Sequence, residues 1–536
     1  MSILKQKKMK SIYKRIAAAP IIAVVVSMLF SNCTKLDVIP ADRFTVDNFF
    51  KNKEEAVSGL ASTYIGLRGL FDIYANGGLY SIDEYQGGNM ATPVRDGFGW
   101  GDGNGIHQRL YKLQVNYNDN YYETITWNWL FQNIGSANWY IDAINSSSLP
   151  GKDSLLAEAR MNRALFHYWA LSYFGNIPYV DTYDASGTSL PEQRKQPYVY
   201  EQLVSEINAC IPLLNSEVNP TTAGRWSKWG AYALLARLYL NAQIFKSEST
   251  DAATWKDPEW DKCIAACDAV INAQKYILEP QYFSNFTYNN ETSRENIFTV
   301  PFDARYGTGL FIAVTHLHPG MMAKYGLPAG SAWNGVVITP DFFSSFDQDD
   351  QRFKNGIVYG PQVNPNGTPI LDGYGNPLNL RATGFTFDAK DYDGARLTKY
   401  TYESGGNPFG MNNDFALFRY ADILMMKAEC LYRKGNAGDA VALINDVRKR
   451  SFATPKPLSA GDLTDARLLL EERQEFFGEM RARMDARRFN QLSKGVRWEK
   501  PAYPTNDADI LPIPQTALRA NPNLKQNPGS IYANMN

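Results

Sequence analysis

Helical periodicity is the feature that most limits what this chain can fold into. In residues 418–451, apolar side chains recur at intervals of three and four residues, which is the spacing of one helix face, at Ala421, Leu424, Met425, Ala428, Leu431 and Tyr432. Gly435 and Asn436 then interrupt the pattern before a second helical stretch, and these residue types favour helix ends. Residues 418–451 therefore predict two helices joined by a short turn.

Two further segments have the same period. Residues 153–180 predict one helix that ends at Gly175, with Pro178 just beyond it. Residues 224–245 predict another, with apolar positions at Ala231, Leu234, Leu235, Leu238, Tyr239 and Ala242. Helix pairs with small residues at their crossings resemble tetratricopeptide-type units, but the period is not regular along the whole chain. We therefore expect a partial helical array rather than a regular solenoid.

Long segments without a helical period separate these helices. Residues 72–122, 280–400 and 491–536 are rich in Gly, Asn, Pro and aromatic residues. Such composition predicts loops with short strands. Loops of this length inside a folded protein usually carry function, so we expect functional residues among them.

The N-terminus has the organisation of an export signal. Residues 5–15 are basic without an acid, and the apolar run 16–30 follows, which is shorter than the about 20 residues of a membrane span. Cys33 ends the sequence "FSNC", which is similar to a lipoprotein cleavage site, although Asn32 departs from the usual small residue. We expect a signal peptide over residues 1–32 and a lipid on Cys33. The alternative is an ordinary signal peptide with an incidental cysteine.

Charge and composition limit the classes of partner. The net charge is −1 at pH 7, which disfavours nucleic acid and a basic membrane-surface patch. Aromatic residues make up 13% of the chain, and aromatic faces stack on sugar rings as well as on one another. The roughly 500 residues behind the signal are too many for one compact core and favour two or more closely packed lobes.

Five segments, in order along nearly the whole mature chain, resemble the SusD/RagB family of Bacteroidetes outer-membrane nutrient-binding lipoproteins. They are "CTKLDVIPADRFTVDNFFKNKEEAVSGL", "RMNRALFHYWALSYFGNIPYV", "GRWSKWGAYALLARLYLNA", "FALFRYADILMMKAECLYRKGNAGDAVALINDVRKRS" and "ILPIPQTALRANPNLKQNPG". Each segment alone is a weak signal. Their shared order makes the resemblance specific.

The resemblance implies a mostly α fold, in which tetratricopeptide-like helix pairs pack against a loop-rich ligand-binding subdomain. The parts expected are one SusD-like domain over 33–536, a helical scaffold at about 45–71, 123–280 and 415–490, and loop-rich regions at about 72–122 and 281–414. The resemblance also implies a lipid-anchored protein on the outer face of the outer membrane. There it would capture an oligosaccharide and pass it to a SusC-like TonB-dependent transporter, without catalysis, cofactor or metal ion.

One segment departs from the family pattern. Residues 471–489, "EERQEFFGEMRARMDARRF", keep the spacing of the family's charged residues, but Met480 replaces its Gly and Ala482 its usual Arg. Glu479 and Arg483 stand at i, i+4, so we expect them to pair on one helix. We interpret these charges as a structural network rather than a ligand site.

The candidate ligand site lies in the two long irregular regions. A glycan needs aromatic faces for the C–H side of its rings and planar polar groups for its hydroxyl rim. Residues 81–113 place such side chains among seven glycines, which predicts an exposed loop, and they resemble the family stretch in which a Trp faces the glycan. The candidates are Trp100 as the leading platform, with Arg95, Asp102 and Asn104, and from the second region Tyr306, Trp333 and Asn334.

Other chemistries have weaker support. His316 and His318 lack a third metal ligand, and the aspartates within 388–393 lack the spacing of a calcium loop. Asp83 and Glu84 would point to opposite sides of an extended strand, so this pair forms no glycosidase site. The sequence therefore favours binding over catalysis.

Two functional alternatives stay open: a peptide cargo, as in the RagB branch of the family, or a surface glycoside hydrolase. The Gly-rich loop around Trp100 favours sugar over peptide, while starch, levan, chitin and hemicellulose fit about equally well. Cys263 and Cys267 lie at i, i+4 in a predicted helix without a CxxC motif, which favours buried thiols over a metal site or a disulfide.

Overall fold

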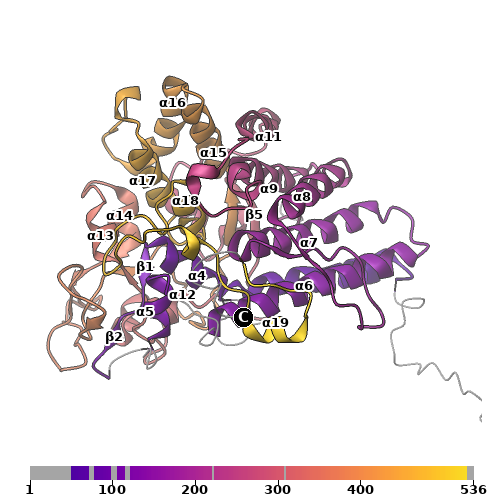
Figure 1. Ribbon diagram of the computed structural model, residues 1–536. Helices are drawn as coiled ribbons and strands as arrows, with labels where there is room; N and C mark the ends of the chain where they lie inside the picture. Colours follow the sequence, from indigo (N-terminus) through magenta and orange to yellow (C-terminus); the bar gives the residue numbers. More distant parts are fainter. Residues whose placement is uncertain are drawn as a thin grey trace, which may run out of the picture. The chain divides into compact units, whose positions relative to one another are not determined.

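The computed structural model confirms a mostly α fold (Figure 1). Among the described residues, no helix combines the length and the hydropathy that a membrane span needs. The structure describes residues 50–71, 78–97, 100, 105–114, 121–219, 222–306 and 310–527. The predicted signal peptide and Cys33 lie outside these ranges.

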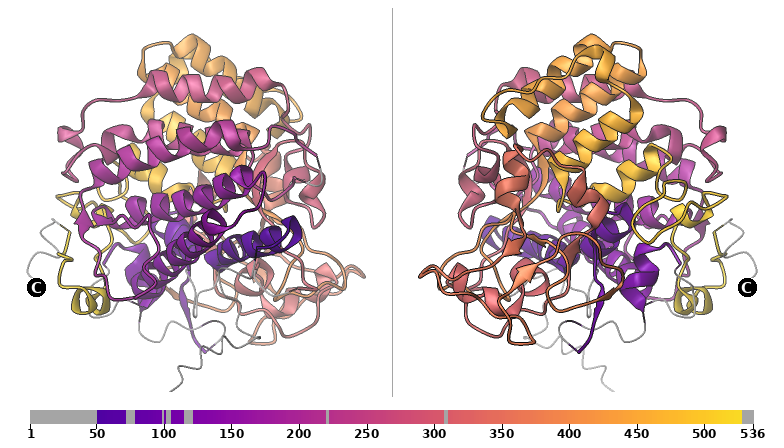
Figure 2. Two further views of the ribbon diagram at one scale, coloured as in Figure 1. Left: turned by 90° about the vertical axis from the view of Figure 1, so that its right-hand side faces the viewer. Right: turned by 90° about the vertical axis from the view of Figure 1, so that its left-hand side faces the viewer.

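The helical part is a succession of packed neighbours. Its helices are α3 (Lys53–Ile65), α6 (Tyr121–Ser146), α7 (Asp153–Phe174), α8 (Gln196–Cys210), α9 (Lys228–Leu240), α10 (Ala242–Phe245), α11 (Trp260–Ala273), α15 (Tyr420–Arg433), α16 (Ala437–Arg448), α17 (Asp465–Phe476), α18 (Ala482–Arg488) and α19 (Gln515–Ala520). From α6 to α9, each helix packs on the next; α9 packs on α11, α11 on α15, and α15 on α16. Figure 2 shows these helices stacked one above another.

The predicted helices follow from local sequence. The helix pair expected in residues 418–451 is α15 and α16. Helix α7 ends where predicted, because Gly175 adopts a φ of +67° at the C-cap, a conformation that glycine reaches without strain. Residues 161–174 of α7 are all buried, and its Arg163 is paired with Glu206 at 2.5 Å. Helix α7 is therefore a central element of the core.

The loop-rich part contains short helices and strand pairs of two residues. The helices are α4 (Leu79–Gly87), α5 (Ile106–Tyr111), α12 (Ile312–His316), α13 (Pro340–Ser344) and α14 (Gln351–Gly356). The strand pairs are β1 (Met90–Ala91) with β6 (Val337–Ile338), β2 (Val94–Arg95) with β10 (Asp388–Ala389), β7 (Ile357–Val358) with β11 (Arg396–Leu397), and β8 (Gly360–Pro361) with β9 (Asn379–Leu380). The β2–β10 pair is parallel and the others are antiparallel. In the helical part, β3 (Ile177–Pro178) pairs with β4 (Gln193–Arg194).

A longer strand pair joins the two parts. Strand β5 (Asn296–Val300) pairs with β12 (Phe415–Arg419), which continues directly into α15. Arg419 is fully buried and binds Glu295 at 2.6 Å, Glu475 at 3.2 Å and Glu479 at 2.6 Å. Removing one partner from such a buried network leaves an uncompensated charge, so the network fixes this junction.

The prediction that Glu479 and Arg483 pair on one helix is wrong. Helix α17 ends at Phe476 and α18 begins at Ala482. Between them Met480 adopts a φ of +58°, which is a left-handed conformation. Glycine, which the family pattern has at this position, reaches this conformation at no steric cost. Glu479 binds Arg419, whereas Arg483 donates to the side chain of Gln86 at 2.6 Å. The charges do form a structural network, as interpreted from the sequence.

The prediction of an exposed loop around residues 81–113 is also wrong at both ends. Residues 106–111 form α5, in which His107, Leu110 and Tyr111 are buried. Residues 79–87 form α4 and are all buried, including Asp83 and Glu84. Helix α18 packs on α4, and a Cβ at Gly87 would lie 2.3 Å from the Cβ of Ala482. Gly87 therefore allows two helices to approach closely instead of opening a loop.

Candidate functional site

Trp100 and Trp333 form the centre of an aromatic cluster in the loop-rich part. Their ring centroids are 5.6 Å apart, and the Trp100 backbone N–H donates to the Trp333 carbonyl. Trp333 also approaches Phe409, at 6.3 Å, and Trp100 packs against His107 at 4.4 Å. The two tryptophans are partly buried and Phe409 is 36% exposed. Trp100, Trp333 and Phe409 are named the aromatic cluster below.

The chain around Trp333 is held by α12. The Trp333 N–H donates to the carbonyl of Val314 at 2.7 Å, and the Gly335 N–H donates to that of Thr315 at 3.1 Å. Gly335 lies against the Trp100 ring, because a Cβ at this position would sit 2.6 Å from Cε3 of Trp100. Both tryptophans are thus positioned by backbone that α12 anchors.

Asn334 follows Trp333 directly and is fully buried, with a φ of +51°. Its Nδ2 donates to Oδ1 of Asp391 at 2.9 Å, and its Oδ1 accepts from Nη2 of Arg396 at 2.6 Å. Asp391 also contacts Nε2 of His318 at 2.7 Å and accepts from the Gly373 N–H at 2.6 Å. The Asn334 side chain is therefore engaged inside the protein, where it orders the loop that carries Trp333.

Arg95 has a similar position and is only 5% exposed. Its Nη1 donates to the carbonyl of Gly335 at 3.1 Å and its Nη2 to that of Asp393 at 2.9 Å. Burial lowers the pKa of Arg95 to about 10, which leaves the side chain charged at neutral pH. Arg95 thus supports the backbone beneath Trp100.

Tyr306 lies near the edge of the same region and is 76% exposed. The turn that carries it is tied to the chain after Phe409, because the Ala304 N–H donates to Oδ1 of Asn412 at 2.8 Å. The guanidinium of Arg305 lies 5.4 Å from the ring centroid of Tyr306. The structure therefore offers Tyr306 as a second, more exposed aromatic face.

Asp102 and Asn104, predicted as polar partners of Trp100, lie outside the described residues. Sequence reasoning missed Phe409 and Gly335. Phe409 stands in the Gly- and Asn-rich stretch "SGGNPFGMNN", whose composition resembles that of the loops that carry Trp100 and Trp333. Gly335 follows Trp333 and Asn334 directly, but its contact with Trp100 spans more than 200 residues and leaves no local signal.

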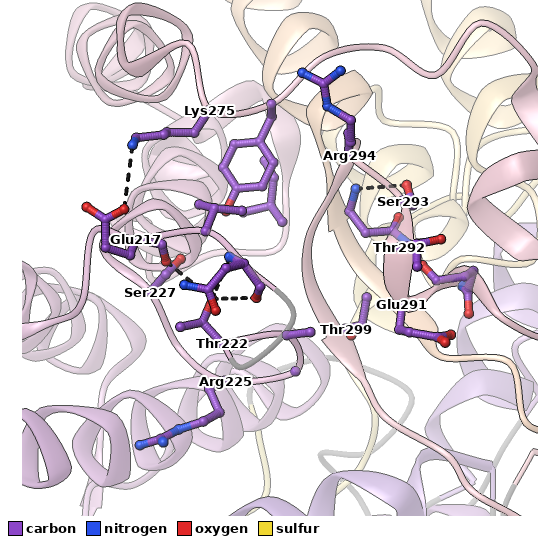
Figure 3. A pocket seen from close by; sticks show the side chains of 18 residues that line it. Glu217, Thr222, Arg225, Ser227, Lys275, Glu291, Thr292, Ser293, Arg294 and Thr299 are labelled. Carbon is purple, nitrogen blue, oxygen red and sulfur yellow. Dashed lines mark hydrogen bonds and ion pairs between the residues drawn. The ribbon is translucent and has the colours of Figure 1, made fainter.

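Only a small hollow lies beside Trp100 among the described residues, while a larger cavity lies elsewhere (Figure 3). The hollow beside Trp100 has a volume of about 10 Å³, about the space of one water molecule. The other cavity has about 290 Å³ and lies between residues 217–227, 275–276 and 290–299. Its aromatic lining residue Tyr276 is only 5% exposed. We base the site on the aromatic cluster, because stacking on sugar requires exposed aromatic faces.

The acidic and metal-binding candidates lie in the interior. Asp83 and Glu84 are 2% and 0% exposed, and burial, followed by the neighbouring Asp83 charge, raises the pKa of Glu84 to about 8. His316 is the last residue of α12 and is fully buried. Cys263 and Cys267 are buried free thiols, as predicted. Among the residues that the structure describes, no group of three or more His, Cys, Asp or Glu could hold a metal ion.

Comparison with known proteins gives consistent matches over most of the chain. The model of the SusD family matches residues 294–529, and a model described as "Starch-binding associating with outer membrane" matches residues 70–240. The starch-binding protein SusD of Bacteroides thetaiotaomicron is 24% identical over an alignment of 583 positions, which covers 97% of this chain and 100% of that protein.

Solved structures share the fold. Surface glycan-binding protein A from Bacteroides uniformis has a TM-score of 0.70 at 19% identity, covering 89% of this chain and 99% of that one. Surface glycan-binding protein A from Bacteroides thetaiotaomicron, in complex with laminarihexaose, has a TM-score of 0.69 at 18% identity, with coverage of 89% and 99%. At this identity the likeness establishes the architecture.

Proposed function

Since this chain belongs to the SusD/RagB family, we propose that it is a non-catalytic lipoprotein of the outer membrane that binds glycans through its aromatic cluster. The observation that carries the proposal is the partly exposed pair Trp100 and Trp333, held by backbone anchored on α12. Flat aromatic faces suit the apolar side of a pyranose ring. The relatives include a starch-binding protein and a surface glycan-binding protein in complex with laminarihexaose, which supports a glycan ligand.

The residues have two kinds of role in this proposal. Arg95 and Asn334 act from below, where they order the loops. The residues in direct contact with the glycan are Trp100, Trp333, Phe409 and Tyr306, with Asp102 and Asn104 as polar partners. A rigid support matters because a loop already ordered before binding loses less conformational entropy when the ligand arrives.

The proposal includes delivery to a transporter. A lipid on Cys33 would hold the protein on the outer face of the outer membrane, and a SusC-like TonB-dependent transporter would receive the captured oligosaccharide. The family and the signal-like N-terminus support this arrangement. Radiolabelled palmitate should enter the wild-type protein and be absent from Cys33→Ala; label that persists in the variant would contradict the anchor.

The binding test uses maltoheptaose, laminarihexaose, chitohexaose and xylohexaose, together with levan and a peptide library. We expect saturable binding of at least one of these glycans without release of reducing ends. Trp100→Ala should weaken that binding more than about tenfold, the effect of losing a central Trp contact. Arg294→Ala, which alters the lining of the larger cavity, is the control and should bind as wild type does.

The same experiment separates the alternatives. Binding of peptides alone would transfer the assignment to a RagB-like cargo. Reducing ends released over hours by purified protein would indicate a hydrolase. Glycan binding that Arg294→Ala weakens and Trp100→Ala does not would place the ligand in the cavity of Figure 3 instead of on the aromatic cluster.

A further inference from the structure

An exposed tyrosine, Tyr374, lies on a hydrogen-bonded turn between β8 and β9. The bridges Val363–Pro369 and Leu371–Pro377 continue the pairing of these strands into two successive turns. In the second turn, the Asp372 carboxylate accepts hydrogen bonds from the Tyr374 and Asn376 N–H groups at 2.9 and 2.8 Å. Gly375 supplies the φ of +85° that the turn requires. Tyr374, which is 45% exposed, is therefore presented by fixed backbone.

Tyr374 is paired with a second ring. Its centroid lies 6.4 Å from that of Tyr392, which is partly buried. The guanidinium of Arg381 lies 5.7 Å from the Tyr392 centroid. Arg381 is held by Asp393, with Nε to Oδ1 at 2.6 Å and Nη2 to Oδ2 at 2.8 Å. Tyr374 and Tyr392, named the tyrosine pair, are thus flanked by a planar donor group of fixed orientation.

The tyrosine pair shares its support with the aromatic cluster. The carboxylate of Asp391 accepts from the N–H of Gly373, next to Tyr374, and from the side chain of Asn334, next to Trp333. Asp391 is only 2% exposed, so it joins the two loops from within. Summed through these hydrogen bonds and backbone steps, the separation between the Cα atoms of Trp333 and Tyr374 is roughly 20 Å at most.

A single exposed tyrosine is ordinary on a protein surface. Here two tyrosines, an oriented guanidinium and a turn fixed by its own hydrogen bonds occur together, on the frame that also positions Trp333. Aromatic faces suit the C–H side of a sugar ring. Arg381 Nη1, for which the described residues provide no hydrogen bond, suits a hydroxyl group.

We infer that the tyrosine pair is a second contact site for the glycan held by the aromatic cluster, so that the protein selects chains of several sugar residues over di- and trisaccharides. The inference rests on the proposed function. It assigns to Tyr374, Tyr392 and Arg381 a role in the selection of glycan length.

The test measures affinity for long and short members of each glycan series with the full-length protein in detergent. The long probes are the four oligosaccharides named above, and the short probes are maltotriose, laminaritriose, chitotriose and xylotriose. Tyr374→Ala should weaken binding of the long probe about 3- to 10-fold and leave the trisaccharide unchanged. Trp100→Ala should weaken both. Tyr183→Ala, which removes a tyrosine of similar exposure, 42%, should weaken neither.

Tyr392→Phe keeps the ring and should bind the long probe as wild type does, which separates stacking from a hydroxyl contact. The inference is overturned if Tyr374→Ala binds the long probe as tightly as wild type, or loses equal affinity for the long and the short probe. A result in which wild type binds glycans and only this pattern fails leaves the proposed function intact. A wild type that binds none of the glycans overturns both.

Discussion

Replacing Gly335 with alanine tests the packing of the aromatic cluster. The new Cβ would lie 2.6 Å from Cε3 of Trp100 and 2.9 Å from the carbonyl oxygen of Thr315. Non-bonded carbon atoms rest about 3.5–4.0 Å apart, so the Trp100 ring or its support must move by about 1 Å. The Thr315 carbonyl is part of the backbone of α12, which cannot move aside as a side chain can. Overpacking of this kind costs about 1–3 kcal/mol of stability.

Equilibrium urea unfolding of Gly335→Ala and Gly135→Ala provides the assay. Gly135 lies in helix α6 with nothing within 4 Å of an added Cβ. Alanine there should stabilise the protein by about 0.5–1 kcal/mol, because glycine loses more conformational entropy in a helix. The same chemical change should therefore have opposite effects on the free energy of unfolding at the two positions.

A double-mutant cycle identifies the ring as the cause. In the Trp100→Ala background the contact with Cε3 is absent, so Gly335→Ala should cost less than in wild type. An equal cost in both backgrounds would refute the packing of Trp100 on Gly335. So would a Gly335→Ala protein that is as stable as wild type.

Two further predictions concern the interior. Arg419→Met should lower the free energy of unfolding by about 3–5 kcal/mol, because it removes the cation that the buried carboxylates of Glu295, Glu475 and Glu479 share. Lys427→Met, which removes a more exposed pair with Asp268 at 2.5 Å, should cost about 0–1 kcal/mol. Equal costs in urea unfolding would contradict the network. Burial and the charge of Asp83 raise the pKa of Glu84 from 4.5 to about 8, so between these values the native state binds more protons than the unfolded state and this group's contribution to stability falls as pH rises. Glu84→Gln should remove the contribution of Glu84 to the fall in thermal unfolding temperature between pH 5 and 8. A pH dependence of the unfolding temperature identical to that of wild type would argue against a protonated Glu84.

The sequence predicts the helices because their signals are local. Apolar spacing and the Gly435–Asn436 break identify α15 and α16, and Gly175 marks the end of α7. The candidate platforms Trp100 and Trp333 came from resemblance and from their Gly-rich surroundings, and the structure brings the two rings together.

The differences arise from contacts between distant parts of the chain. The local sequence predicts a loop at Gly87, but Gly87 lies against Ala482 where two helices pack. Arg95 reads as part of a polar rim, yet its acceptors are the carbonyls of Gly335 and Asp393 far along the chain. Met480 interrupts a charged segment that reads as one helix. None of these partners is visible in a local pattern.

A structure of the protein bound to the long oligosaccharide that wild type binds best tests the central claim most directly. The account predicts sugar rings stacked against Trp100 and Trp333, with the rest of the oligosaccharide extending towards Tyr374. Sugar density in the cavity lined by Glu217 and Arg294, with the two tryptophans bare, would contradict it.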